Sequence, residues 1–359
     1  MSLIIGVLKE NADNRVAITP ENIKRSKIKD ATWWVEHGAG MEAGFSDHAY
    51  NGLAEIKDKE TILKGADILA SVFPPAETDL EKMRSGMLLI SQFRPYQDTG
   101  IMEKLEKYDI RVFSMDMVPR TTLAQAMDVL SSMASVAGYR AVLTAAQQLP
   151  RYFPMMITSA GSIRPAKVLV LGAGVAGLQA IATARKLGAV VEAFDVRQAA
   201  KEEVQSLGAK FVEVEGATDD KGAGGYAVQQ SEEFLARQRA EVQSHAAKSD
   251  VIICTAQIRG RQAPVLIEAD TVSLMRHGSV IVDLAASTGG NCALTENDKT
   301  IKKFGVTIIG NSSLDKDMPE DASQMYGNNI LNLLNHITKD GTLNLNLEDE
   351  IVKGGLIKS

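Results

Sequence analysis

The sequence has few of the residues that build disulfide or metal frameworks. Only two cysteines occur in 359 residues, Cys254 and Cys292, and they lie far apart. Neither has the spacing of a metal site or of a redox pair. We therefore expect two buried, reduced thiols of the kind found in cytoplasmic proteins, and no metal.

Basic clusters are also missing. The formal net charge is −6, and no block of Lys and Arg is present. Because nucleic-acid binding depends mainly on Lys and Arg contacts to phosphates, this composition argues against a nucleic-acid partner.

The sequence also lacks the pattern of a signal peptide. The start, "MSLIIGVLKEN", has no basic region followed by a long apolar core. The uncharged run at 168–184 approaches the length of a membrane span, but its glycines and its Gln argue against a span. We expect a chain without a membrane-spanning helix.

Two series of short apolar runs alternate with helix-like stretches, in a chain long enough for two domains. The expected strands are 3–8, 32–38, 67–72, 87–92 and 111–116, then 167–172, 189–195, 210–215, 249–256, 278–285 and 306–310. Alternation of this kind predicts the α/β class, with two Rossmann-like, doubly wound parallel-sheet domains.

A long helix is expected to join the two domains. Residues 121–148 contain no internal Pro and many Ala, Leu and Met residues, which favours one continuous helix. The expected domains are then 1–120 together with 311–359, and 149–310. A further helix at 322–337 would return to the first domain, ahead of a short polar tail.

The clearest chemical signal is a glycine-rich turn at the start of the second series. Gly172, Gly174 and Gly177 form G-x-G-x-x-G between a strand and a helix, and Asp195 closes the next strand. This arrangement is typical of dinucleotide binding, with the pyrophosphate at the helix N-terminus. Asp195 would accept hydrogen bonds from the ribose and repel a 2′-phosphate, which favours NAD over NADP despite the nearby Arg197.

Residues that could exchange a proton with a substrate are not grouped in any familiar way. The five histidines, 37, 48, 245, 277 and 336, form no recognisable catalytic set, so we favour structural roles for them. Arg15, after the first strand, could grip a carboxylate or could form a structural ion pair. Both interpretations stay open.

The stretch "PRTTLAQAMDVLSS" (119–132) has polar residues of an unusual kind. After its single Arg come Thr, Gln, Asp and Ser, without the Lys and Glu of a water-facing helix. On a helical wheel, the polar side chains share a 120° arc. They are Gln125, Asp128, Ser131, Ser132, Ser135 and Tyr139. Such a face suits either a ligand cleft or a polar seam between helices.

Four segments together resemble one superfamily. They are "KENADNRVAITP", "MVPRTTLAQAMDVLSSMASVAGYRA", "FPMMITSAGSIRPAKVLVLGAGVAGLQAIATARKLGA" and "GSVIVDLAASTGGNC". They resemble the alanine dehydrogenase and proton-translocating transhydrogenase superfamily, and the match is closer to the NAD(H)-binding component of the transhydrogenases. The Lys and His of the alanine dehydrogenase site are replaced here by Phe73 and Phe93, which argues against amino-acid oxidation.

The resemblance implies a set of nucleotide-binding residues. Arg120, Gln125 and Asp128 would position the nicotinamide and its ribose and so serve catalysis, with Ser131 and Ser132 beside them. The other implied cofactor contacts are Val175, Ala176, Val196, Arg197, Gly225, Tyr226, Gln238 and Gln257, in addition to the glycines and Asp195. Tyr226 would close over the nucleotide from the irregular loop 215–227. Gln257 and Arg259 depart from the family's usual "TALIPGKPAPVL".

The resemblance also implies a reaction and partners. Hydride would pass directly between NADH and NADP⁺ held on a partner domain, so no acid or base is needed at this site. The implied partners are the NADP(H)-binding domain, a membrane subunit that conducts protons, and a second copy of the chain. The location would be cytoplasmic, peripheral to the inner membrane. A soluble amino-acid or opine dehydrogenase and a non-catalytic NAD-binding module remain as alternatives.

Overall fold

The computed structural model describes residues 2–97, 100–214 and 231–359. They form two compact units. Unit 1 consists of Met1–Met133 with Asp315–Ser359, and unit 2 is Ala134–Leu314. The chain therefore leaves unit 1 once and returns to it after unit 2.

Unit 1 contains a seven-stranded sheet in the order β18-β6-β5-β4-β1-β2-β3. All of its neighbouring strands are parallel except β18, which runs antiparallel to β6. The strands are β1 Leu3–Val7, β2 Ala31–Glu36, β3 Glu55–Lys57, β4 Ile68–Ala70, β5 Leu88–Ser91, β6 Arg111–Ser114 and β18 Leu356–Lys358. The helices are α1 Pro20–Arg25, α2 Lys59–Gly65, α3 Glu77–Leu80, α4 Ile101–Leu105, α10 Pro319–Ile337 and α11 Glu350–Gly355.

Unit 2 has a second seven-stranded sheet, in the order β11-β10-β9-β12-β13-β15-β14. Only β14 is antiparallel to its neighbour. The strands are β9 Lys167–Leu171, β10 Val190–Phe194, β11 Lys210–Phe211, β12 Val251–Cys254, β13 Val280–Asp283, β14 Lys299–Lys303 and β15 Val306–Gly310. The helices are α5 Val129–Gln148, which begins in unit 1, α6 Val175–Lys186, α7 Ala200–Ser206, α8 Glu232–Ala247 and α9 Ala269–Leu274.

The two faces of the unit 2 sheet are both covered by helices. One hydrophobic cluster joins the sheet to Ala141 and Ala145 of α5 and to Ile181 of α6. The opposite cluster contains Val242 of α8 and Val272 of α9. Burial on both faces explains why β12 and β13 read as continuous apolar runs, with every residue buried. The expected α/β class with two Rossmann-like sheets is confirmed.

The expected helix at 121–148 is wrong in its first two turns. Residues 121–128 form successive i→i+3 turns, including the 3₁₀ helix η4 (Gln125–Met127), and α5 begins only at Val129. The Asp128 carboxylate accepts the backbone N–H of Ser131 at 2.9 Å and so caps α5. An Asp side chain that accepts a free backbone N–H in the first turn marks the start of a helix, so α5 begins directly after Asp128.

Helix α5 is long and apolar enough to cross a membrane by length and composition. Its buried residues, however, include Ala141, Val142 and Ala145, which belong to the core of unit 2. The run at 168–184, considered above as a span, is divided between β9, the glycine turn and α6.

The C-terminal segment differs from the expected polar tail. After α10 come a small β16–β17 hairpin (Thr338–Lys339 and Thr342–Leu343), then α11 and β18. Strand β18 pairs with β6 and extends the first sheet. Helix α10 packs on α1, where a Cβ on Gly327 would lie 2.0 Å from Asn22 Oδ1. The last segment thus belongs to unit 1.

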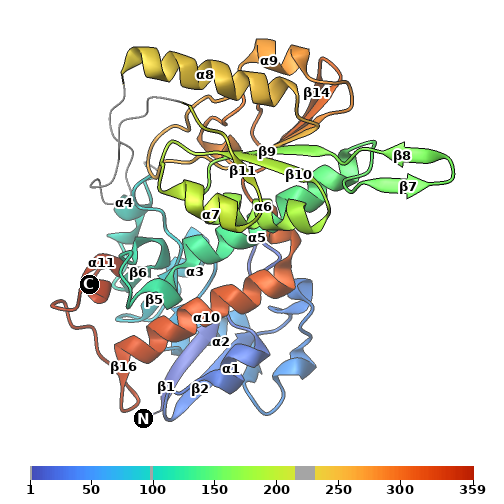
Figure 1. Cartoon of the computed structure of the whole chain (residues 1–359). Helices are drawn as coiled ribbons and strands as arrows, with labels where there is room; N and C mark the ends of the chain where they lie inside the picture. Colours follow the sequence, from blue (N-terminus) through green and yellow to red (C-terminus); the bar gives the residue numbers. More distant parts are fainter. Residues whose placement is uncertain (1, 98–99, 215–230) are drawn as a thin grey trace. The chain divides into compact units, whose positions relative to one another are not determined.

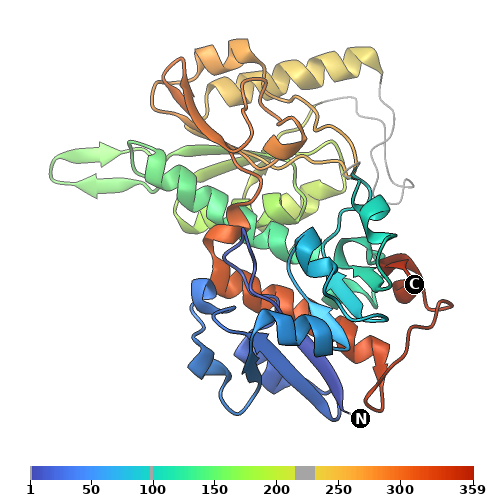
Figure 2. The ribbon, with the colours of Figure 1, turned by 180° about the vertical axis from the view of Figure 1, so that it is seen from behind.

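A two-stranded hairpin, β7 Met156–Thr158 with β8 Gly161–Ile163, extends from unit 2 and is seen at the side of the molecule in Figures 1 and 2. It pairs with neither large sheet. Ile157 is 74% exposed and Met155 58% exposed. The sequence pattern predicts no strands here, because the region is short and polar at its tip.

Candidate functional site

The glycine-rich turn lies at the point where strand order reverses in unit 2. Strand β9 has β10 on one side and β12 on the other, so connections diverge from its carboxyl end. In open α/β sheets this is where ligands bind. The turn from β9 into α6 occupies that position.

Two of the three glycines are required by packing. Gly172 has φ +95°, and a Cβ there would lie 2.7 Å from Thr255 Oγ1. A Cβ on Gly177 would lie 1.8 Å from the Gly172 carbonyl oxygen, which brings α6 against the turn. A side chain at either position would therefore disrupt the turn itself.

Gly174 is different, because a Cβ there would meet nothing within 4 Å. It is the N-cap residue of the twelve-residue helix α6, and no side chain in the described part of the chain caps that end. The start of α6 therefore has open space at Gly174 and an exposed Val175. Such a helix start is suited to an anion such as a pyrophosphate.

Asp195 lies just after β10, with its carboxylate directed at the glycine turn. Oδ2 accepts the Ala173 N–H at 2.7 Å. Arg197 donates its backbone N–H and Nε–H to Oδ1, at 2.9 and 3.0 Å, and Nη2 lies 3.0 Å from Oδ2. The structure therefore places Asp195 and Arg197 at the turn and joins them in a two-point ion pair.

Three polar residues that the sequence did not single out form hydrogen bonds in the loops around the glycine turn. Thr255 donates to the Gly172 carbonyl at 2.9 Å. Asn291 bonds Ala256 and Pro264, at both ends of the loop that departs from the family pattern. Asp283, fully buried, accepts the Asn291 N–H at 2.7 Å. The only sequence signal for Thr255 and Asp283 was a polar residue following or closing an apolar strand, and Asn291 had no such signal.

The 119–132 segment places its polar residues differently from the expected helical arc. Gln125 and Asp128 precede α5, whereas Ser131 and Ser132 lie in its first turn. The Ser131 hydroxyl donates to Asp128 Oδ2 at 2.6 Å, so this pair already has a structural role in the cap. The single wheel was wrong because the helix does not include residues 125–128.

Arg120 and Gln125 have exposed side chains. Within the ranges that the structure describes, neither side chain makes a hydrogen bond or an ion pair. The backbone around Gln125 is nevertheless fixed, because Asn329 and Asn332 of α10 donate to the Ala126 carbonyl at 2.9 and 3.1 Å. The held turn thus presents the Gln125 side chain to solvent. No local pattern in the sequence connects α10 with this turn.

The remaining expected contacts belong to unit 2 or to undescribed stretches of the chain. Val196 is 53% exposed, beside Asp195. Gln257 donates to the Leu284 carbonyl at 2.6 Å, which pins its side chain against the sheet edge. Gln238 lies on α8, half-buried. Ala176 follows Val175 in the first turn of α6, and Gly225 and Tyr226 lie outside the described residues.

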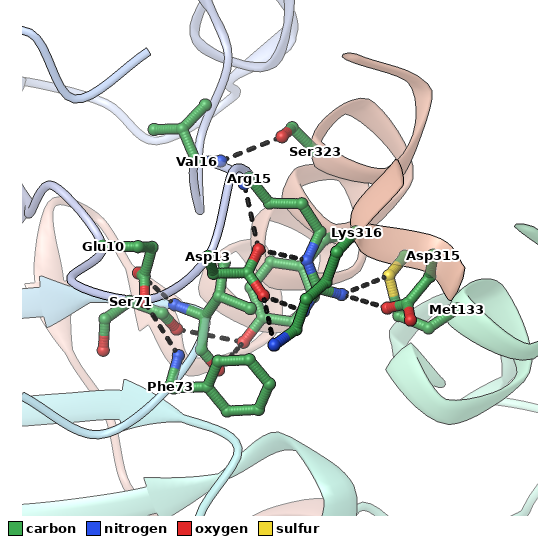
Figure 3. Close-up of polar contacts among 12 residues, drawn as sticks. Glu10, Asp13, Arg15, Val16, Ser71, Phe73, Met133, Asp315, Lys316 and Ser323 are labelled. Atoms are coloured by element: carbon green, nitrogen blue, oxygen red, sulfur yellow. Dashed lines mark hydrogen bonds and ion pairs between the residues drawn. The ribbon is translucent and has the colours of Figure 1, made fainter. Parts of the chain in front are cut away.

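Arg15 is enclosed by acidic groups (Figure 3). Its Nε and Nη2 donate to the two oxygens of Asp13 at 2.7 and 2.8 Å. Nη1 contacts Asp315, and lies 3.0 Å from Met133 Sδ. The guanidinium is almost completely buried. The structure therefore supports the ion-pair interpretation of Arg15. In this arrangement the guanidinium is occupied by Asp13 and Asp315 and is not available to bind a substrate carboxylate.

A cavity of about 200 Å³ lies near this cluster, between the loops that follow β1 and β4. Glu10 and Phe73 line it. The Glu10 carboxylate accepts the backbone N–H groups of Val72 and Phe73, at 2.7 and 3.2 Å. Burial raises the Glu10 pKa to about 7, although these two hydrogen bonds oppose the shift.

The cysteines and two of the histidines have structural surroundings. Cys254 and Cys292 are free and buried, as expected, and burial raises the pKa of both thiols. His245 lies 2.5 Å from Glu192 and 3.1 Å from Glu241, and His336 lies 2.9 Å from Asp349. None of these carboxylate partners belongs to the glycine turn, which supports structural roles for His245 and His336.

Comparison with known proteins agrees with these features. Residues 6–137 match the family described as alanine dehydrogenase/PNT, N-terminal domain, and residues 141–359 match its C-terminal domain. The chain is 44% identical to the NAD(P) transhydrogenase subunit alpha of Cereibacter sphaeroides, covering 98% of this chain and 69% of that relative. It is 42% identical to the NAD(P) transhydrogenase subunit alpha of Haemophilus influenzae, covering 98% and 70%.

Solved structures give the same result. A transhydrogenase from Sinorhizobium meliloti superimposes with a TM-score of 0.91 at 40% identity, covering 99% of this chain and 98% of that one. An L-alanine dehydrogenase superimposes with a TM-score of 0.78 at 24% identity, covering 99% and 95%, which shows a shared fold. The chain belongs to the alanine dehydrogenase/PNT family, and within that family to the transhydrogenases.

Proposed function

We propose that the chain is the NAD(H)-binding component of a proton-translocating transhydrogenase. It is an oxidoreductase component that takes part in direct hydride transfer between NADH and an NADP⁺ molecule bound to a partner domain. The observation that supports this best is a contrast between two sites. The glycine turn has an open, uncapped helix start, whereas Arg15 is neutralised by Asp13 and Asp315.

The chain's own residues would hold the pyrophosphate, the adenosine and the nicotinamide of the nucleotide. The N–H groups at the start of α6, around Gly174 and Val175, would bind the pyrophosphate. Asp195 and Val196 would bind the adenosine, with Gly225, Tyr226, Gln238 and Gln257 as further contacts. The open space at Gly174 fits this assignment, because the ligand needs it and the packing does not.

Arg120 and Gln125 would orient the nicotinamide, and Asp128 would act with them. When bound, NAD(H) supplies or accepts the hydride. Since a hydride exchange between two nicotinamides involves no proton, the residues need to fix distance and orientation only. Asn329 and Asn332 hold the Ala126 carbonyl, which fixes the backbone of the turn from which the Gln125 side chain would reach the ring.

The relatives are named as subunits, so we propose that this chain also works with partners. These would be an NADP(H)-binding domain and a membrane subunit that conducts protons, with the chain on the cytoplasmic side of the inner membrane. We also propose a homodimer. Its support is the β7–β8 hairpin, because an isolated two-stranded hairpin with exposed Ile157 and Met155 is marginally stable in water.

One activity assay separates the proposed function from its alternatives. The purified chain is mixed with an isolated NADP(H)-binding transhydrogenase domain, NADH and an oxidised NADP⁺ analogue. We expect hydride exchange only when both proteins are present. Turnover of a 2-oxo acid with ammonia by the chain alone would instead support an amino-acid dehydrogenase. NADH binding without either activity would support a non-catalytic module.

A further inference from the structure

The carboxylate of Asp195 has no acceptor position left for a ribose. Oδ2 accepts from Ala173 N and Arg197 Nη2, and Oδ1 accepts from Arg197 N and Nε, all within 3.0 Å. A carboxylate offers about four lone-pair sites, so these four donors fill it. The side chain of Asp195 is only 7% exposed.

The four donors are not equally easy to displace. Ala173 N and Arg197 N belong to the backbone of the turn and of the segment after β10. The guanidinium of Arg197, in contrast, ends a flexible side chain that is 35% exposed. A hydroxyl that reaches Asp195 can therefore replace only Nε and Nη2 without moving the backbone.

We propose that Arg197 is a specificity-determining residue that covers Asp195 and must swing away when the adenosine ribose binds. This inference rests on the proposed NAD(H) site and deepens it. The two hydroxyls of an NAD(H) ribose then take the two acceptor positions that the guanidinium leaves. Because this ion pair is broken on binding, Arg197 weakens NAD(H) binding.

The same pair limits discrimination against a 2′-phosphate. A lone carboxylate at this position repels that phosphate, but a displaced Arg197 lies close enough to neutralise some of its charge. Asp195 and Arg197 therefore act in opposite directions on the choice between NADH and NADPH. Selectivity depends on both residues rather than on Asp195 alone.

The test compares NADH and NADPH affinities, measured by nucleotide fluorescence, for the wild-type chain, Arg197→Met and Arg276→Met. Methionine keeps the apolar stem of Arg197 and removes the guanidinium. Arg276 is the matched control, because it also pairs with an aspartate of unit 2, with Nη1 3.4 Å from Asp250, at the opposite ends of the strands. Arg197→Lys keeps the positive charge but not the two-point contact with Asp195. It therefore separates the effect of the charge from the effect of covering the carboxylate.

We expect Arg197→Met to bind NADH roughly threefold or more tightly and NADPH roughly tenfold more weakly, while Arg276→Met changes both less than about twofold. Arg197→Lys should also bind NADH more tightly than the wild type. If Arg197→Met bound NADH equally or more weakly while the wild type binds it, the covering role would be wrong and the NAD(H) site would stand. A wild-type chain that bound no NADH would overturn both proposals.

Discussion

At the scale of single residues, Gln125 is the clearest candidate for a group that acts on the bound ring. Its side chain is exposed, and its turn is fixed from α10 through the Ala126 carbonyl. Asp128 and Ser131, in contrast, are already bonded to each other in the cap of α5. Among the residues that the resemblance groups together, Gln125 is thus available to a ligand, whereas Asp128 and Ser131 hold the helix start.

This difference leads to a prediction for Gln125→Asn. The shorter amide leaves the pyrophosphate and adenosine contacts intact, so NADH affinity should stay within about twofold. Hydride exchange should fall more than about tenfold, because a small displacement of the ring has a large effect on transfer. Fluorescence titration and the exchange assay measure the two quantities. Exchange at the wild-type rate would contradict the role assigned to Gln125.

At the scale of elements, the glycine turn combines two requirements in one short segment. Gly172 and Gly177 make the strand, turn and helix fit together, whereas Gly174 leaves space for a ligand. The two requirements are separable by mutation, because only the first concerns the stability of the fold.

We therefore expect Gly174→Ala to affect mainly NADH binding and Gly177→Ala to affect mainly the stability of the fold. The first has φ −78° and open space, so unfolding free energy should change by about 1 kcal/mol or less, while NADH binding weakens at least roughly tenfold. The second places a Cβ 1.8 Å from a carbonyl oxygen and should destabilise unit 2 by several kcal/mol, on the order of an overpacked core. Urea unfolding and fluorescence titration distinguish them. Equal loss of stability in both variants would contradict the separation.

The strands and the glycine turn were predictable because they depend on local pattern. Continuous apolar runs identified β9, β12 and β13, and G-x-G-x-x-G identified the turn. The start of α5 was not predictable, since composition favours a helix from 121 and only the Asp128 cap decides otherwise. The supports from Asn329 and Asn291 depend on contacts between distant segments, which a periodic pattern does not record.

At the scale of the whole molecule, one half-buried acid should give the free energy of unfolding a distinctive dependence on pH. Glu10 has a pKa raised from 4.5 to about 7 by burial. The folded chain thus binds this proton more tightly than the unfolded chain does. Its contribution to stability is complete below pH 4.5 and is lost as the pH rises to about 7, a change of roughly 3 kcal/mol.

Glu10→Gln should remove that component of the pH dependence. The free energy of unfolding, measured with urea between pH 4.5 and 7, should fall less steeply in Glu10→Gln than in the wild type. The exposed Glu42→Gln serves as the control and should keep the wild-type slope. An unchanged slope in Glu10→Gln would show that Glu10 does not carry the effect.

The homodimer gives a second prediction at this scale. Ile157 is 74% exposed on the β7–β8 hairpin, so Ile157→Asp should not disturb the fold of one chain. If the hairpin covers a second copy, the variant should sediment as a monomer and the wild type as a dimer. Leu274→Asp, at a residue 72% exposed on α9, is the control and should remain dimeric. A dimeric Ile157→Asp would exclude the hairpin as the essential contact.

The central claim is that hydride passes directly between two nucleotides, with no acid or base of this chain taking part. The most direct measurement follows deuterium from NADH that carries deuterium at both C4 positions of the nicotinamide, with the NADP(H)-binding domain and oxidised acceptor present, in ordinary water. We predict that the deuterium appears at C4 of the reduced acceptor without dilution by solvent. Loss of the label to water, or reduction of the acceptor without the label, would contradict direct transfer.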